Sequence, residues 1–130
     1  MDRRAVIMQN KRQQFGKKSE NLAVWYLKKN GYKIIEQNYR TPLGEIDIIA
    51  QEKKTIVFVE VKSRQSIRYG NPKWAVTPKK QRKVSMVALQ YLKSTRQMDA
   101  RARFDVVAVT SNHDQPQIEI VKNAFELAYK

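Results

Sequence analysis

The sequence predicts one α/β domain in which helices pack against a mixed β-sheet of about five strands. Segments rich in β-branched residues are separated by turns, and two longer segments repeat apolar residues at helical spacing. The expected order is α, β, β, β, α, β, β, which favours a sheet covered by helices. A length of 130 residues suits one domain, and an apolar content of 42% argues against disorder.

The N-terminal part predicts a flexible arm followed by a helix. Residues 1–15 are polar and basic without a sustained period, so we expect an arm that precedes a domain over residues 16–130. In residues 16–30, apolar side chains fall on one side and lysines on the other, which is typical of an amphipathic helix. Gly31 is expected to end this helix.

Three strands are predicted to follow. Residues 32–39, 45–50 and 55–62 are rich in β-branched and aromatic residues. Residues 41–44 contain the proline and glycine of a turn. The second and third strands should form a hairpin that folds about residues 52–53.

The second half predicts a loop, a helix and two strands. Residues 63–77 form the loop, and Thr77 is expected to cap a helix that has Pro78 at its first position and ends near residue 94. Apolar residues on one face make this helix amphipathic. The remaining expected elements are strands over 103–110 and 117–121 and one or two helical turns within 122–129.

The residue types present exclude several kinds of site. The chain has no cysteine, which excludes disulfides and thiolate metal sites, and its single histidine, His113, excludes a multi-histidine zinc site. A metal would therefore bind to oxygen ligands, which favours Mg²⁺ or Mn²⁺. We see no apolar stretch that could span a bilayer and no secretory signal, so we expect a cytoplasmic protein without a membrane partner.

The net charge is strongly positive. Twenty-six Lys and Arg against twelve Asp and Glu give +14, which indicates a nucleic-acid partner. A merely basic protein and a protein that binds anionic lipid are the alternatives. Between Val61 and Met98 there are ten Lys and Arg and no acidic residue, with Tyr69 and Trp74 interleaved. A solvated helix face with a packing tryptophan is the alternative for this run. The candidate contacts to nucleic acid are Arg64, Arg68, Lys73, Lys79, Lys80, Arg82 and Lys83.

Three charged residues interrupt the apolar hairpin. Glu60 and Lys62 share a face of their strand by alternation. The expected turn places Asp47 opposite Phe58, one cross-strand step from Glu60. Two carboxylates at that spacing can both reach one cation. The alternative is an edge-strand salt bridge between Lys62 and one of the carboxylates.

Each predicted helix directs one polar residue toward the sheet. At about 100° per residue, Glu20 borders the apolar face of the first helix, and Gln81 lies on the inward face of the second near its start. A glutamate that stabilises the start of a helix is the simpler alternative for Glu20. Together with the hairpin charges, these two residues predict a polar site between the helices and the sheet.

These residues resemble the core of the PD-(D/E)XK nuclease superfamily. The segments GEIDIIA and FVEVKSR match its D-x(12)-E-x-K pattern with Asp47, Glu60 and Lys62. The similarity is closer to the YraN-like bacterial family, which is related to Holliday-junction resolvases, and it runs from Gly16 to the C-terminus. Other matching segments are GKKSENLAVWYLKKNGY, NYRTPLGEIDIIA, KKQRKV, ARFDVVAV and the NAF at 123–125.

The resemblance implies a restriction-endonuclease-like fold for residues 16–130 and a metal-dependent endonuclease that hydrolyses phosphodiester bonds in DNA. Branched DNA and recombination or repair intermediates are the candidate substrates, and a homodimer is expected by analogy with resolvases. A non-catalytic nucleic-acid-binding module of a repair or uptake complex is the main alternative. A structural partner whose basic surface meets an acidic protein is another.

The resemblance also implies roles for individual residues. Hard carboxylate oxygens suit Mg²⁺, and the ion lowers the pKa of its bound water. The resemblance implies metal binding by Asp47, Glu60 and the backbone carbonyl of Val61, with Glu20 joining through water. It implies that Lys62 activates the attacking water and that Gln81 contacts the scissile region.

Overall fold

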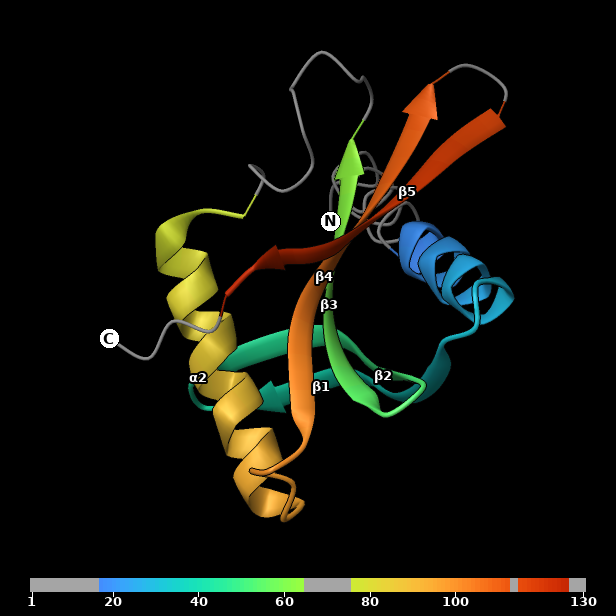
Figure 1. Ribbon diagram of the computed structural model, residues 1–130. Helices are drawn as coiled ribbons and strands as arrows, with labels where there is room; N and C mark the ends of the chain where they lie inside the picture. The colour runs from blue at the N-terminus through green and yellow to red at the C-terminus, as the bar shows by residue number, and fades with distance from the viewer. Residues whose placement is uncertain (1–16, 65–75, 113–114, 127–130) are drawn as a thin grey trace, which may run out of the picture.

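A computed structural model describes residues 17–64, 76–112 and 115–126 (Figure 1). They contain a five-stranded sheet in the order β1-β2-β3-β4-β5, in which only β3 and β4 run parallel. The strands are β1 (Lys33–Thr41), β2 (Gly44–Glu52), β3 (Thr55–Arg64), β4 (Arg101–Asn112) and β5 (Gln115–Phe125). The predicted α/β class with a mixed five-stranded sheet is confirmed, and the arrangement is compatible with a restriction-endonuclease-like fold.

Helices cover both faces of the sheet (Figure 1). Helix α2 (Pro78–Ser94) packs on one face, over a core that includes Phe58. The N-terminal helix, which includes residues 17–29, buries Leu27 on the other face against a core that includes Val59. Because both faces of the central strands are covered, these strands are almost continuously apolar, and a charged residue within them needs a specific partner.

The end of the N-terminal helix and the start of α2, which the sequence predicted from local signals, are confirmed. Gly31 adopts a φ of +89° directly after the N-terminal helix, where a left-handed backbone favours glycine. Helix α2 follows Thr77, whose hydroxyl accepts a hydrogen bond from the N–H of Lys80 at 3.2 Å. Pro78 occupies the first turn, where its missing N–H leaves no bond unmade.

The register of the β2–β3 hairpin differs from the prediction. Its two-residue turn is Lys53–Lys54, one residue later than expected, and Ile49 pairs with Phe58. Asp47 therefore lies beyond the last backbone pair and not opposite Phe58. Lys53 closes the turn with a φ of +55°, a left-handed conformation that lysine rarely adopts. Glycine or asparagine usually marks such a turn, and neither is present here, so the sequence did not indicate where the turn lies.

The predicted helical turns at the C-terminus are wrong, because residues 122–125 continue strand β5. The backbone bulges at Asn123, whose φ is +52° and whose N–H donates to the carboxylate of Asp105 at 2.9 Å. Beyond the bulge, the ring of Phe125 stacks on Phe104 with centroids 4.7 Å apart. These long-range contacts outweigh the local preference of the segment.

Some predictions fall outside the described residues. These are the arm at 1–15, residues 127–129 of the tail, and the part of the predicted loop that holds Arg68, Tyr69, Lys73 and Trp74. At its start the loop prediction is wrong, because β3 continues through Arg64 and pairs there with β4. Within the described ranges, neither helix is long and apolar enough to cross a membrane.

Candidate functional site

The candidate site lies where β2 and β3 separate. Their backbone pairing ends at Ile48 and Val59, and beyond it Oδ2 of Asp47 accepts a hydrogen bond from the N–H of Val61 at 2.8 Å. Strand β2 is irregular at the same point, because Ile46 packs on the α2 side of the sheet and Ile48 on the other side. Residues two apart normally share a face, so the change of face occurs at Asp47.

Glu60 is buried on the α2 side of β3 and is 6% exposed. Its Oε1 lies 3.7 Å from Nζ of Lys80 and 4.0 Å from Nζ of Lys62. Its Oε2 has no hydrogen-bond partner among the described residues. Burial, followed by the charge of Asp47, raises the pKa of Glu60 to about 7. The two carboxylates therefore interact across the gap between β2 and β3.

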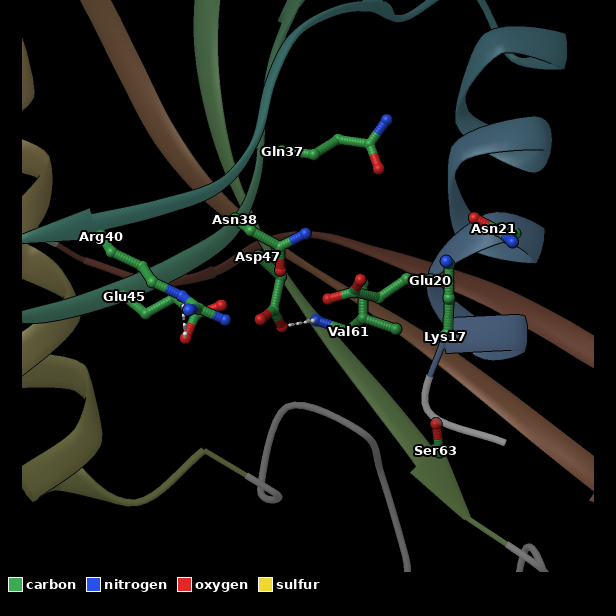
Figure 2. A pocket seen from close by; sticks show the side chains of 10 residues that line it. All are labelled: Lys17, Glu20, Asn21, Gln37, Asn38, Arg40, Glu45, Asp47, Val61 and Ser63. Carbon is green, nitrogen blue, oxygen red and sulfur yellow. Dashed lines mark hydrogen bonds and ion pairs between the residues drawn. The ribbon is translucent and has the colours of Figure 1, made fainter. Parts of the chain in front are cut away.

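Asp47 and Glu20 meet at a cavity of about 510 Å³ on the side of the N-terminal helix. Figure 2 shows Glu20 extended from that helix toward Asp47 and Val61. Burial is the main cause that raises the pKa of Asp47, and the hydrogen bond from Val61 opposes it. Burial and then the charge of Asp47 raise the pKa of Glu20. The cavity is lined by Lys17, Glu20, Asn21, Gln37, Asn38, Arg40, Glu45, Asp47, Val61 and Ser63.

Asn38 is a site residue that sequence reasoning missed. It lies on β1 beside Asp47, between the pairs Gln37–Ile48 and Tyr39–Ile46, and has a φ of +54°. With its amide nitrogen turned to the acceptors around it, Asn38 donates to Oε1 of Glu45 at 3.1 Å and to Oε1 of Glu20 at 3.2 Å. Asparagine tolerates a left-handed backbone better than most residues. An asparagine in the strand before the one that carries Asp47 was therefore the only local signal for this site residue.

The structure brings the predicted residues together in two groups. Asp47 and Glu20 line the cavity, whereas Glu60 and Lys62 form an ion pair on the other side of Asp47. The described parts of the chain contain no group of three or more His, Cys, Asp or Glu side chains placed to bind one metal ion. Metal binding through Asp47, Glu60, Glu20 and the carbonyl of Val61 therefore stays a prediction.

Gln81 and Arg64 already have partners in the protein. Nε2 of Gln81 donates to the carbonyl of Val76 at 2.9 Å, which secures the segment that enters α2. Nε of Arg64 donates to the hydroxyl of Thr110 at 3.0 Å and joins the ends of β3 and β4. Contact of Gln81 with the scissile region and of Arg64 with nucleic acid stay predictions.

The first turns of α2 carry four cations. Lys79, Arg82 and Lys83 are exposed, while Lys80 is half-buried and pairs with Glu60. The first turn contains no acidic residue, although the helix dipole favours negative charge there. This concentration of positive charge at a helix start is unfavourable for the isolated protein and favours a bound anion.

The fold and the site together define a small basic α/β protein in which carboxylates and lysines meet where two strands separate. The sequence profile of UPF0102, an uncharacterised protein family, matches residues 19–109. A UPF0102 protein of Geobacter metallireducens is 57% identical over 114 residues, which are 88% of this chain and 93% of the relative. One of Desulfosudis oleivorans is 52% identical over 119 residues, which are 92% of this chain and 95% of the relative. The chain belongs to the UPF0102 family, which is the YraN-like family that the sequence resembles.

Proposed function

We propose that this protein is a metal-dependent endonuclease of the PD-(D/E)XK superfamily that hydrolyses phosphodiester bonds in DNA in the cytoplasm, with branched or repair intermediates as substrates. One observation carries the proposal: a buried oxygen of Glu60 without a partner among the described residues lies in a site shared with Asp47 and Lys62. Proteins rarely leave a buried polar atom unpaired, so the site suits a ligand that supplies positive charge.

The carboxylates suit Mg²⁺ or Mn²⁺. Mg²⁺ commonly uses one or two protein carboxylates and keeps several waters, which matches Asp47 and Glu60 without a third acid. Burial raises the pKa of both carboxyls, and a nearby cation would favour their charged forms. A bound ion would supply a water of lowered pKa and would stabilise charge on the phosphate.

Lys62 and Lys80 supply mobile positive charge at the same point. Their ammonium groups lie 4.0 Å and 3.7 Å from Oε1 of Glu60, beyond ordinary hydrogen-bond length. Each can therefore turn from Glu60 to a phosphate oxygen or to the attacking water. We assign orientation of the water to Lys62 and contact with the phosphate to Lys80, while Glu20 joins the site through water.

The exposed cations of α2 extend this site along the DNA backbone. Within the first two turns of the helix, Lys80 is flanked by Lys79, Arg82 and Lys83. The net charge of the whole chain is +14. Cations that neutralise phosphates release counterions, so affinity should fall steeply with salt. By analogy with resolvases, which cut two strands, we propose a homodimer.

Cleavage of a panel of labelled DNAs tests the proposal. Linear, nicked, flapped and four-way substrates are incubated with Mg²⁺ or Mn²⁺ and with wild type or Asp47→Asn. We expect wild type to cut at least one branched substrate, and Asp47→Asn to bind it equally well without cutting. Glu119→Gln, which removes an exposed carboxylate on β5, is the matched control and should cut like wild type. The nuclease proposal fails if wild type cuts none of these DNAs.

A non-catalytic nucleic-acid-binding module is the second candidate. It is favoured by the two ammonium groups that already face Oε1 of Glu60. In such a module, Lys62 and Lys80 balance the charge of Glu60 permanently. Tight, salt-dependent binding of branched DNA without any cleavage would identify it.

A further inference from the structure

The outward face of the N-terminal helix carries a tryptophan among lysines. Trp25 is 55% exposed, more than any other large apolar residue that the structure describes. The Nζ of Lys29 lies 5.1 Å from the centroid of its ring. The exposed residues of the helical stretch 17–29 are Lys17, Lys18, Asn21, Trp25, Lys28 and Lys29. This face therefore combines one large ring with positive charge and has no exposed acidic residue.

The same face begins at the candidate site. Lys17 and Asn21 line the cavity that contains Asp47, and Figure 2 shows both on the helix beside it. Trp25 follows Asn21 by four residues, so it lies on the same side of the helix, one turn further along. From Lys17 to Trp25 the rise is roughly 12 Å, about the rise of three or four nucleotides of a DNA strand.

We propose that Trp25 stacks on an unpaired base, while Lys29 contacts a phosphate beside that base and Lys17 contacts a phosphate three or four nucleotides nearer the candidate site. This inference rests on the proposed function and deepens it, because it specifies a substrate with a single-stranded segment next to the scissile phosphate. Bases in a duplex already stack on each other, whereas an unpaired base offers its flat face to an aromatic side chain. Lysines beside the ring supply the charge that tracks the backbone.

The surroundings of Trp25 favour nucleic acid over a protein partner. The cores of protein interfaces are depleted in lysine and contain several apolar residues together. Here four lysines and Asn21 are the only other exposed side chains on the helical stretch 17–29. A polyanion with flat rings matches this combination of charge and surface.

Fluorescence of Trp25 tests the stacking directly. The chain has two tryptophans, so Trp74→Phe leaves Trp25 as the only one. The full-length variant is titrated without divalent cations with a single strand, a blunt duplex, and a duplex with a single-stranded tail. We expect the single strand and the tailed duplex to quench Trp25, and the blunt duplex to leave its emission nearly unchanged at concentrations that saturate binding.

Affinity measurements supply the second readout. Trp25→Ala should weaken binding of the single strand and the tailed duplex by roughly 5- to 100-fold, Trp25→Phe should recover most of the loss, and the blunt duplex should bind as before. Leu43→Ala is the matched control, because Leu43 is 49% exposed and lies beside α2, away from the N-terminal helix. It should leave all three affinities unchanged.

Three results would overturn the inference. The first is equal affinity of Trp25→Ala and wild type for tailed DNA. The second is quenching of Trp25 by the blunt duplex that equals quenching by the tailed duplex. The third is a Trp25→Ala variant whose only defect is loss of self-association, which would assign the face to a second copy of the chain. Cleavage of tailed DNA with Mg²⁺ separates the two proposals. Stacking without cleavage of the tailed DNA or of any DNA in the panel above removes the nuclease alone, whereas cleavage with unaltered affinity of Trp25→Ala removes the stacking alone.

Discussion

Two acidic side chains of the described residues are buried, Asp105 and Glu60. Asp105 accepts hydrogen bonds from the hydroxyl of Tyr32 at 2.8 Å, from Nε of Arg103 at 3.0 Å and from the N–H of Asn123 at 2.9 Å. Glu60 has two ammonium groups at longer range and one oxygen without a partner in these parts of the chain. Asp105 is therefore held as a structural anion, whereas Glu60 is available to a ligand.

The stability of the protein should depend on the ionisation of Glu60. The pKa of this carboxyl is about 7 in the folded protein and about 4.5 in the unfolded chain. The folded state then binds more protons between these values, so stability falls as pH rises through this window. Glu60→Gln should be more stable than wild type by about 1–3 kcal/mol at pH values above 7, and the difference should vanish below about pH 4.5.

Urea unfolding across this pH range, without divalent cations, measures the effect. Glu119→Gln is the control, because Glu119 is exposed and its removal should leave the pH profile unchanged. A Glu60→Gln variant that is less stable than wild type at alkaline pH would show that the ion pairs with Lys62 and Lys80 outweigh the burial of the charge.

Binding of a divalent cation should appear as thermal stabilisation. A ligand that binds only the folded state raises stability by mass action, so millimolar Mg²⁺ or Mn²⁺ should raise the Tm of wild type by about 3 °C or more. Asp47→Asn should lose this rise but keep the fold, since the amide oxygen can still accept the hydrogen bond from Val61. Calorimetry in buffers without other divalent cations measures the rise in Tm. An equal rise in both proteins would show that the cation binds away from Asp47.

At the scale of elements, Arg103 on β4 joins segments that are distant in sequence. Its Nη2 donates to Oε1 of Glu52 at 2.7 Å and to the hydroxyl of Tyr32 at 3.1 Å, and Nζ of Lys122 donates to Oε2 of Glu52 at 2.9 Å. The end of β2, the residue before β1, and strands β4 and β5 are thereby connected. Asp105 lies at the buried end of this network.

Removal of the buried anion should therefore loosen several strands at once. Asp105→Ala leaves the N–H of Asn123 without its acceptor and removes one of the two carboxylates that bind Arg103, which should lower the free energy of unfolding by about 3–5 kcal/mol. Urea unfolding measures this loss. Asp99→Ala, at an exposed position before β4, should change stability by less than about 0.5 kcal/mol. A similar loss in both variants would contradict the role of the network.

The elements that the sequence predicted well are those with local signals. Helix α2 begins where expected because Thr77 and Pro78 act within one turn, and its apolar face follows from spacing alone. The hairpin register was wrong because the turn depends on Lys53 in a left-handed conformation. The strand predicted over 117–121 is part of β5, but its continuation through residues 122–125 was missed because the contact between Phe125 and Phe104 joins residues far apart in sequence.

The same division holds for the site. Regular alternation along β3 places Glu60 and Lys62 on one face, as predicted, whereas the change of face at Asp47 in β2 could not be predicted from the spacing. The ion pair between Lys80 and Glu60 and the contacts of Asn38 depend on how a helix and an edge strand pack on the sheet. No local pattern in the sequence encodes that packing.

At the scale of the whole molecule, positive charge should govern binding of DNA. Combined replacement of Lys79, Arg82 and Lys83 by Ala should reduce the slope of log affinity against log salt by about one for each phosphate that is no longer neutralised, about three in total. Lys80 is left in place because it pairs with Glu60. Fluorescence anisotropy at several salt concentrations measures the slope.

The matched control removes three exposed lysines elsewhere. Lys33, Lys53 and Lys54 lie at the opposite end of β1 and of the β2–β3 hairpin from Asp47. Their combined replacement by Ala changes the net charge equally but should leave most of the slope intact. Equal effects of the two triple variants would indicate that net charge, and not the surface at α2, determines binding.

The parallel pairing of β3 with β4 has a consequence for the order of folding. Strands β1, β2 and β3 are joined by short turns, whereas β4 reaches β3 only after the connection that contains α2. Closing that long connection should come late. Val87→Ala in α2 should then give a lower φ-value than Ile49→Val in β2, and the reverse order would contradict this sequence of events. Asp47 and Glu60 would then lie side by side before Lys80 packs against Glu60. Docking of α2 would therefore complete the fold and neutralise the acidic site in a single kinetic step.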